Sequence, residues 1–165
     1  MYDPDRLLQA LRMVNDWSLP STYAQTKVHH GYRRAALVQA GHWLPVAELF
    51  WFVLNDFSPT HEVWISHIDP GGFIVPHNDA SRWRERWQVP IQPAGVMVLD
   101  GVETTSEAGV PFPVAHWAPH SVWNLTDKPR IHLVIDLARY IERPAAPFQT
   151  FPIPERYHSL ISSGS

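Results

Sequence analysis

Prolines limit what this chain can fold into more than any other feature, because 16 of them are spread through 165 residues. Proline lacks a backbone donor and disrupts helix interiors, so long helices are disfavoured along most of the chain. It is tolerated at strand edges and in turns. Hydrophobic residues make up 45% of the sequence, which is enough to pack one core at this length. We therefore expect a single domain over residues 1–165, built mainly from short strands joined by turns.

Two helices are expected ahead of most of the strands. Asp3 stands before a proline, which is a typical helix start, and apolar residues then recur at helical spacing as far as Asp16. Pro45 begins a second amphipathic run, which ends before Pro59. We expect residues 1–58 to form a helical buttress for the strands that follow.

The stretch between these helices has only a weak pattern. His29 and His30 are adjacent, and adjacent residues on a strand point to opposite faces, so the pair cannot easily chelate one ion. We interpret the pair as part of a solvent-exposed loop. We expect the basic residues Arg33 and Arg34 at the surface.

Strand signals fill residues 62–140, the expected barrel core. A strand that includes His67, at a sheet edge, is followed by a Pro70-Gly71-Gly72 turn. Residues 84–91 then alternate between two faces. The apolar face holds Trp87, Val89 and Ile91, and the polar face holds Arg84, Arg86 and Gln88. Such a polar face needs solvent or an anionic guest if it is buried, and an ordinary half-exposed strand explains it equally well.

A second alternating strand covers residues 130–137. Its less apolar face carries Arg130, His132, Val134 and Asp136. Before it, Asp100-Gly101 predicts a tight turn, and the small, polar residues 104–109 are a candidate lid. After Tyr140 the segment 141–165 is rich in proline, and we expect it to wrap around the domain in extended form and end in a frayed tip.

A His-x-Asp motif lies at the end of an apolar strand. His77 and Asp79 are two residues apart, so an extended chain projects both side chains to the same face. His116 and His120 are both candidates for a third ligand, and Arg130 stands ten residues after His120. Two histidines and one carboxylate on one face of a metal, with open positions opposite, form the arrangement of non-haem Fe(II) oxygenases.

With these motifs, the segment from about Pro70 to Asp136 resembles the 2-oxoglutarate/Fe(II)-dependent oxygenases. It is most similar to the aspartyl/asparaginyl β-hydroxylase-like branch, which includes small amino-acid and prolyl hydroxylases. Only His120 has an arginine at the spacing of the family, which favours it over His116. Two helices and about eight short strands predict a mainly β fold, a double-stranded β-helix of the jelly-roll or cupin type.

The resemblance implies roles for individual residues. The catalytic metal ligands would be His77, Asp79 and His120, and Arg130 would pair with the distal carboxylate of 2-oxoglutarate. The run from Arg86 to Ile91 resembles the branch's Arg-x-His-apolar-Pro-apolar strand, so Arg86 and Gln88 would contact the cosubstrate, with Gln88 in place of the usual His. The implied cofactors are Fe(II), 2-oxoglutarate and O2, with ascorbate as a candidate reductant. The implied enzyme is a dioxygenase that hydroxylates an unactivated C–H bond.

The substrate is predicted to be small: an amino acid, a peptide or a natural-product intermediate. The predicted substrate contacts are Arg82, Arg84, Trp87, Trp123 and His132. Two alternatives stay open. Basic residues with aromatics also suit single-stranded nucleic acid, as in a demethylase-type oxygenase, although a net charge of −3 opposes this. The second alternative is a non-catalytic cupin-like module that binds a metal or another ligand. A structural zinc site in such a module would commonly use cysteine, and this chain has none.

The absence of cysteine also fits a reducing, cytoplasmic compartment. The N-terminus carries Asp3, Asp5 and Arg6 instead of a basic region and an apolar core, so we expect no signal peptide. No uncharged run approaches about 18 residues, so no membrane span is expected. The sequence contains no signal for an oligomeric state.

Overall fold

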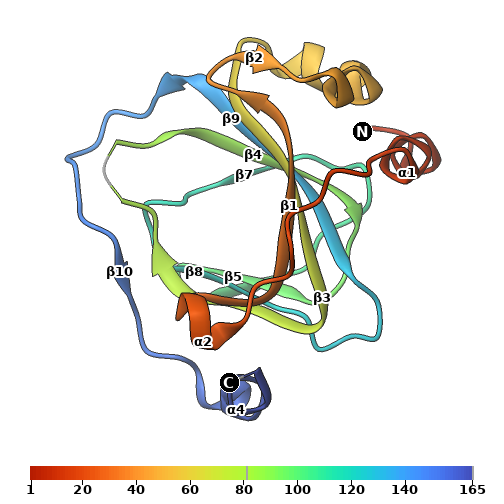
Figure 1. Cartoon of the computed structure of the whole chain (residues 1–165). Helices are drawn as coiled ribbons and strands as arrows, with labels where there is room; N and C mark the ends of the chain where they lie inside the picture. The colour runs from red at the N-terminus through yellow and green to blue at the C-terminus, as the bar shows by residue number, and fades with distance from the viewer. Residues whose placement is uncertain (81, 165) are drawn as a thin grey trace.

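The computed structural model describes residues 1–80 and 82–164. Over these residues, ten antiparallel strands form one sheet that curls round on itself (Figure 1), in the order β6-β5-β8-β3-β9-β4-β7, with β1 and β10 also paired to β3 and β2 paired to β1. The strands are β1 (His29–Gln39), β2 (His42–Trp43), β3 (Thr60–Asn78), β4 (Arg84–Gln92), β5 (Val96–Leu99), β6 (Val102–Thr104), β7 (Phe112–Val114), β8 (His120–Trp123), β9 (Arg130–Tyr140) and β10 (Gln149–Thr150). The predicted mainly β jelly-roll architecture is confirmed.

Strand β3 is the longest element, and it passes through both walls of the barrel. Its first half pairs with β9 and its second half with β8 and β10, while β1 runs beside both halves. The turn predicted at Pro70-Gly71-Gly72 is instead a bend within this strand, with Gly71 at φ +77°. At the bend, the backbone nitrogen of Gly71 donates a hydrogen bond to the backbone oxygen of Asn124, and the backbone nitrogen of Asn124 donates to the oxygen of Gly72. Backbone pairing therefore continues through the bend.

α1 (Pro4–Arg12) and the helical segment of residues 45–57 cover one outer face of the sheet (Figure 1). α1 starts at the predicted Asp3 cap but ends before Asp16. The second predicted helix is a chain of short turns: η1 (Pro45–Phe50), α3 (Trp51–Leu54) and η2 (Asn55–Phe57). Among the described residues, no helix is both long and apolar enough to cross a bilayer.

The main core lies between these helices and the apolar faces of β4 and β9. It includes the buried side chains of Leu7, Phe50, Leu54, Val89, Ile91, Leu133 and Ile135. The alternation predicted for residues 84–91 and 130–137 is therefore confirmed. The opposite faces of both strands point into the barrel.

The prediction of a loop at His29-His30 is wrong. Residues 29–39 form β1, so the N-terminal region is not only a helical buttress; it also contains α2 (Tyr23–Thr26) and β2. The polar character of residues 29–34 concealed the strand. One of its faces contributes to a polar cavity, so hydrophobicity does not alternate along it as it does in β4.

The C-terminal segment wraps the barrel as predicted, with β10 paired to the end of β3. The frayed tip predicted after it is wrong. η3 (Glu155–Tyr157) and α4 (His158–Gly164) dock on the sheet, where the Tyr157 ring stacks on Trp123 with centroids 4.2 Å apart and planes at 3°. Burial of these two aromatic rings holds the segment in place.

Candidate metal centre

Three side chains converge where β3 and β8 pair. His77 and His120 are direct partners in the antiparallel register, and Asp79 follows just after the end of β3. One ligand atom from each of the three lies within 4.8 Å of the others. Asp79 Oδ1 is 3.5 Å from Nε2 of His77 and 3.6 Å from Nε2 of His120. The predicted convergence of residues far apart in the chain is thus present in the structure.

Backbone carbonyls orient both imidazoles. His77 Nδ1 lies 2.8 Å from the oxygen of Val75, and His120 Nδ1 lies 2.9 Å from the oxygen of Ala118. An Nδ1–H that donates to a carbonyl leaves Nε2 as the atom with a free lone pair. Both free lone pairs therefore belong to the nitrogens that face Asp79 Oδ1.

The other oxygen of Asp79 is already engaged. Oδ2 accepts hydrogen bonds from Arg86 Nη1 at 2.7 Å and from His116 Nδ1 at 2.8 Å. Burial alone would raise the pKa of this carboxyl, but its contacts with the imidazoles of His116, His120 and His77, together with the charge of Arg86, hold the pKa well below its usual value. Asp79 is therefore an ionised carboxylate with one oxygen left for a cation.

The three candidate ligands open into a cavity of about 310 Å³ inside the barrel. Its walls come from seven strands. The lining residues are Val28, His29, Tyr32, Arg34, Trp64, Ser66, Ile68, Ile74, His77, Asp79, Arg86, Gln88, Met97, Val114, His120, Val122, Arg130 and Val134.

Arg130 is the most unusual residue in this cavity. It starts β9, is 4% exposed, and its Nε has no hydrogen-bond partner among the described residues. Burial lowers the pKa of Arg130, because no carboxylate of the described chain offsets the loss of hydration. A buried guanidinium without a partner is costly, so the cavity favours an anionic guest at this point.

A family comparison matches residues 9–140 to the aspartyl/asparaginyl beta-hydroxylase family. The chain belongs to that family. The match reaches well beyond residues 70–136 and includes the end of α1 and the whole of β1. Membership of a hydroxylase family, together with the His-His-Asp cluster, indicates a metal-dependent, oxygenase-like enzyme. A search of curated protein sequences found no match to this chain.

Solved structures with a similar fold include cupin proteins and a polyketide cyclase. A cupin-like protein from Thermotoga maritima is 12% identical, with a TM-score of 0.56 over 92% of this chain and 96% of its own. A cupin-2 domain from Rhodospirillum rubrum is 13% identical, with a TM-score of 0.51 over 90% and 81%. The polyketide cyclase RemF from Streptomyces resistomycificus is 13% identical, with a TM-score of 0.51 over 82% and 85%. At these identities the likeness concerns the fold alone.

Arg86 holds two carboxylates, whereas a cosubstrate contact was predicted for it. Its Nε and Nη2 reach Oδ1 and Oδ2 of Asp136 at 2.7 and 3.0 Å, and its Nη1 reaches Asp79. Arg86 and Asp136 are opposed on β4 and β9, which fixes the fork geometry. Arg86 therefore links the ligand carboxylate to the barrel wall.

Gln88 lines the cavity, and its amide oxygen lies 2.8 Å from Nδ1 of His132. His132 is fully buried and does not line the cavity, in contrast to the substrate contact predicted for it. Its Nε2 lies 3.3 Å from Oγ of Ser106 in the 104–109 segment, the candidate lid. Burial and the nearby charge of Arg130 lower the pKa of His132 well below its usual value, so the ring is neutral.

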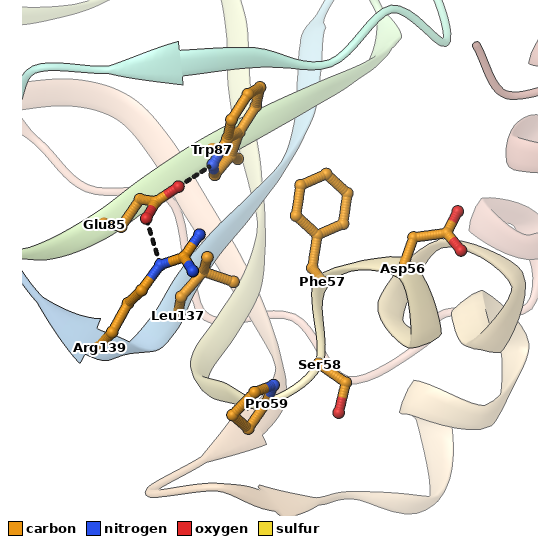
Figure 2. A pocket seen from close by; sticks show the side chains of 8 residues that line it. All are labelled: Asp56, Phe57, Ser58, Pro59, Glu85, Trp87, Leu137 and Arg139. Carbon is orange, nitrogen blue, oxygen red and sulfur yellow. Dashed lines mark hydrogen bonds and ion pairs between the residues drawn. The ribbon is translucent and has the colours of Figure 1, made fainter.

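Four other predicted substrate contacts lie outside the cavity. Trp87 is on the apolar face of β4, where it donates to Glu85 and lines a separate pocket with Phe57 and Arg139 (Figure 2). Trp123 is fully buried under Tyr157.

Arg84 and Arg82 both gather at Tyr140. Arg84 donates to the Tyr140 hydroxyl and to the oxygen of Ala138, and the Arg82 guanidinium stacks on the Tyr140 ring. Neither arginine lines the cavity of the metal centre. The rules of strand alternation already placed Trp87 away from the barrel interior, whereas the partners of Trp123 and the two arginines are distant in sequence.

Several cavity residues were missed by sequence reasoning. His29, Tyr32 and Arg34 come from β1, and Trp64 and Ser66 come from β3. For Trp64 and Ser66 a signal existed, because they alternate with the buried Val63 and Ile65. For β1 the only local signal was Gly31, whose positive φ marks a bulge.

Proposed function

We propose that the chain is an Fe(II)- and 2-oxoglutarate-dependent dioxygenase that hydroxylates an unactivated C–H bond of a small substrate. The observation that carries this proposal is the placement of Arg130. Its buried, unpaired guanidinium shares one cavity with the three candidate metal ligands. An anion that also binds the metal would satisfy both features at once.

The ligand set suits Fe(II). Neutral imidazoles from His77 and His120 and one carboxylate from Asp79 leave net positive charge on a divalent ion and leave adjacent positions open. The engagement of Asp79 Oδ2 by Arg86 and His116 favours binding through Oδ1 only. Bound together, iron, 2-oxoglutarate and dioxygen supply the oxidising chemistry that converts a C–H bond to an alcohol, with succinate and carbon dioxide as co-products.

The chain's own residues position the reactants. Arg130 presents a planar fork of donors that matches the far carboxylate of 2-oxoglutarate. Gln88 also lines the cavity and has its amide oxygen near His132, so its NH2 group is the part left to donate.

The cavity volume of about 310 Å³ supports a small substrate such as an amino acid, a short peptide or a natural-product intermediate. The nucleic-acid alternative has less support. It depended on Arg82 and Arg84, whose guanidinium groups are taken up by Tyr140 and the backbone of Ala138.

The test is spectroscopic and then catalytic. Fe(II) and 2-oxoglutarate are added without dioxygen, and the weak visible charge-transfer band of the chelate is recorded. Succinate formation is then measured in air. We expect both signals in the wild type and neither in His77→Ala or His120→Ala.

His67→Ala is the matched control. His67 is another half-buried histidine of β3, but it lines a separate hollow beside Trp17. This variant should keep the band and the turnover. Tight Fe(II) binding without the band would instead favour the non-catalytic cupin-like module. Full turnover after substitution of either ligand histidine would contradict the assignment of the site.

A further inference from the structure

One wall of the cavity has no role in the metal centre or in the proposed cosubstrate contact. It consists of His29, Tyr32 and Arg34 of β1, which we call the β1 wall. In the antiparallel register these residues oppose Ile74, Ile68 and Ser66 of β3. Directly opposed residues share one face of a sheet, and all three β3 partners line the cavity. The β1 wall therefore faces the same space as the metal ligands.

A bulge makes this wall possible. His29 and Tyr32 are three residues apart, so a regular strand would point them to opposite faces. The register shifts between His30 and Tyr32, and Gly31 in this shift has φ +64°. A Cβ at Gly31 would meet Asp69 Cβ at 3.3 Å, and the positive φ adds strain for a larger residue, so the backbone here favours glycine. The bulge turns His29 into the cavity and leaves His30 stacked against Phe73.

Arg34 is the charged group of the β1 wall. Its guanidinium stacks on the Trp64 ring at 4.4 Å, and no carboxylate of the described residues forms an ion pair with it. Its neighbour Arg33 points to the other face and pairs with Asp69 at 3.3 Å. The two adjacent arginines thus differ in partner and in burial. Arg33 is half-buried and has an internal counter-charge, whereas Arg34 is exposed at the cavity and has none among the described residues.

The charged groups around the cavity, compared with their partners, indicate which kind of ligand Arg34 can bind. Arg86 pairs with both Asp79 and Asp136, and His116 also contacts Asp79. By the proposed function, a divalent ion would offset the negative charge that remains. Arg130 and that ion together would accommodate the two carboxylates of 2-oxoglutarate. Arg34 is then the remaining uncompensated charge among the groups that line the cavity.

We propose that the β1 wall recognises the substrate, and that the substrate is a small carboxylic acid whose carboxylate pairs with Arg34. This inference rests on the proposed function of the metal centre. Stacking on Trp64 holds the guanidinium in place before binding, which reduces the entropy lost when the ion pair forms.

The two other residues of the wall supply polar contacts. His29 Nδ1 lies 2.7 Å from Ser21 Oγ, which fixes the ring, and Nε2 has no hydrogen-bond partner among the described residues. Burial raises the pKa of Tyr32, so its hydroxyl remains a neutral donor. A substrate held by Arg34 would meet these two groups on its way to the metal.

The experiment measures binding without turnover. The full-length protein is loaded with Mn(II) and saturating 2-oxoglutarate in the absence of dioxygen. The probes are amino acids, aromatic acids and short dicarboxylic acids, each compared with its primary amide. Mn(II) broadens the proton NMR signals of a molecule bound near it, so the readout reports both affinity and proximity to the metal.

We expect acids to be broadened and their amides not. Arg34→Gln should weaken binding of the acids by about 10- to 100-fold, which is the range for loss of a charge-assisted contact. Arg33→Gln is the matched control and should bind the acids like the wild type. The 2-oxoglutarate chelate band with Fe(II) should be unchanged in both variants.

Two results would overturn this inference while leaving the proposed function intact. One is equal binding of acids by the wild type and Arg34→Gln, which would make Arg34 only a stacking partner of Trp64. The other is that no acid is broadened, or that amides are broadened as strongly as acids. Loss of the chelate band in the wild type would instead contradict the proposed function itself.

Discussion

Arg86 lies 2.7 Å from Asp79 through Nη1 and Oδ2, so one guanidinium holds one oxygen of the candidate ligand and leaves the other to a metal. The same guanidinium forms a two-point contact with Asp136. Together the three side chains connect the metal centre to β9. Partners of metal ligands of this kind set the orientation of the ligand and its affinity.

Arg86→Gln should therefore weaken metal binding by about 10- to 100-fold. It should also lower the free energy of unfolding by about 3–5 kcal/mol, because Asp136 is left buried without its counter-charge. Isothermal titration with Mn(II) and urea unfolding measure the two effects. Arg139→Gln, which removes an exposed partner of Glu85, should change neither. Wild-type metal affinity in Arg86→Gln would show that Asp79 needs no such support.

Arg130→Met should separate cosubstrate binding from metal binding. We expect the metal content to stay as in the wild type and the dissociation constant for 2-oxoglutarate to rise about 10- to 100-fold, since a charge-assisted fork is lost. Without 2-oxoglutarate the variant should be at least as stable as the wild type, because a buried and unpaired charge has been removed. Titration calorimetry and thermal unfolding with and without 2-oxoglutarate check both parts. A variant that is less stable and binds 2-oxoglutarate normally would contradict the role of Arg130.

His132 should make the stability of the metal-free protein depend on pH. Its ring stays neutral in the fold, while the unfolded chain takes up a proton near the ordinary pKa of 6.5. Stability from this group is therefore complete above that pH and is lost as the pH falls below it, by up to about 1.4 kcal/mol per pH unit. The free energy of unfolding, measured with urea between pH 7 and about 5, should fall less steeply with decreasing pH for His132→Gln than for the wild type. The exposed His42→Gln should keep the wild-type slope, and an unchanged slope in His132→Gln would be inconsistent with a neutral buried ring.

Tyr157→Ala should show that the C-terminal helix is part of the fold. The ring is 1% exposed and stacked on Trp123, so truncation should cost about 3–5 kcal/mol of unfolding free energy. Tyr157→Phe keeps the stacking and loses only the hydrogen bond to Glu103, which should cost about 1 kcal/mol. Denaturant midpoints measure both. Equal stability of Tyr157→Ala and the wild type would mean that the C-terminal helical segment does not stabilise the barrel.

Local periodicity predicted much of the barrel interior. Alternation placed Arg86, Gln88 and Arg130 opposite the apolar faces of their strands, because successive side chains of a strand point to opposite sides whatever the strand pairs with. In the structure all three line the cavity. The same rule projects His77 and Asp79 together. These features depend only on the chain near each residue, so the sequence contains them.

Partners that come from distant strands were not predictable in this way. Arg86 was expected to contact a cosubstrate, yet its partner Asp136 stands 50 residues away and meets it only through the β4–β9 register. Trp123 was expected at the substrate, yet a tyrosine from beyond the prolines covers it. Each outcome depends on which strands pair and in which register.

The amino-acid sequence by itself determined the spacing of the ligands, the faces of the regular strands and the absence of long helices, because these follow from backbone geometry over a few residues. Only the tertiary structure decided that β1 faces the cavity. Its direction is set by a bulge at Gly31 and by pairing with β3, and neither is encoded in a hydrophobic pattern. The same pairing leaves Arg34 without a counter-charge and gives Arg33 one, although the two residues are identical and adjacent in the chain.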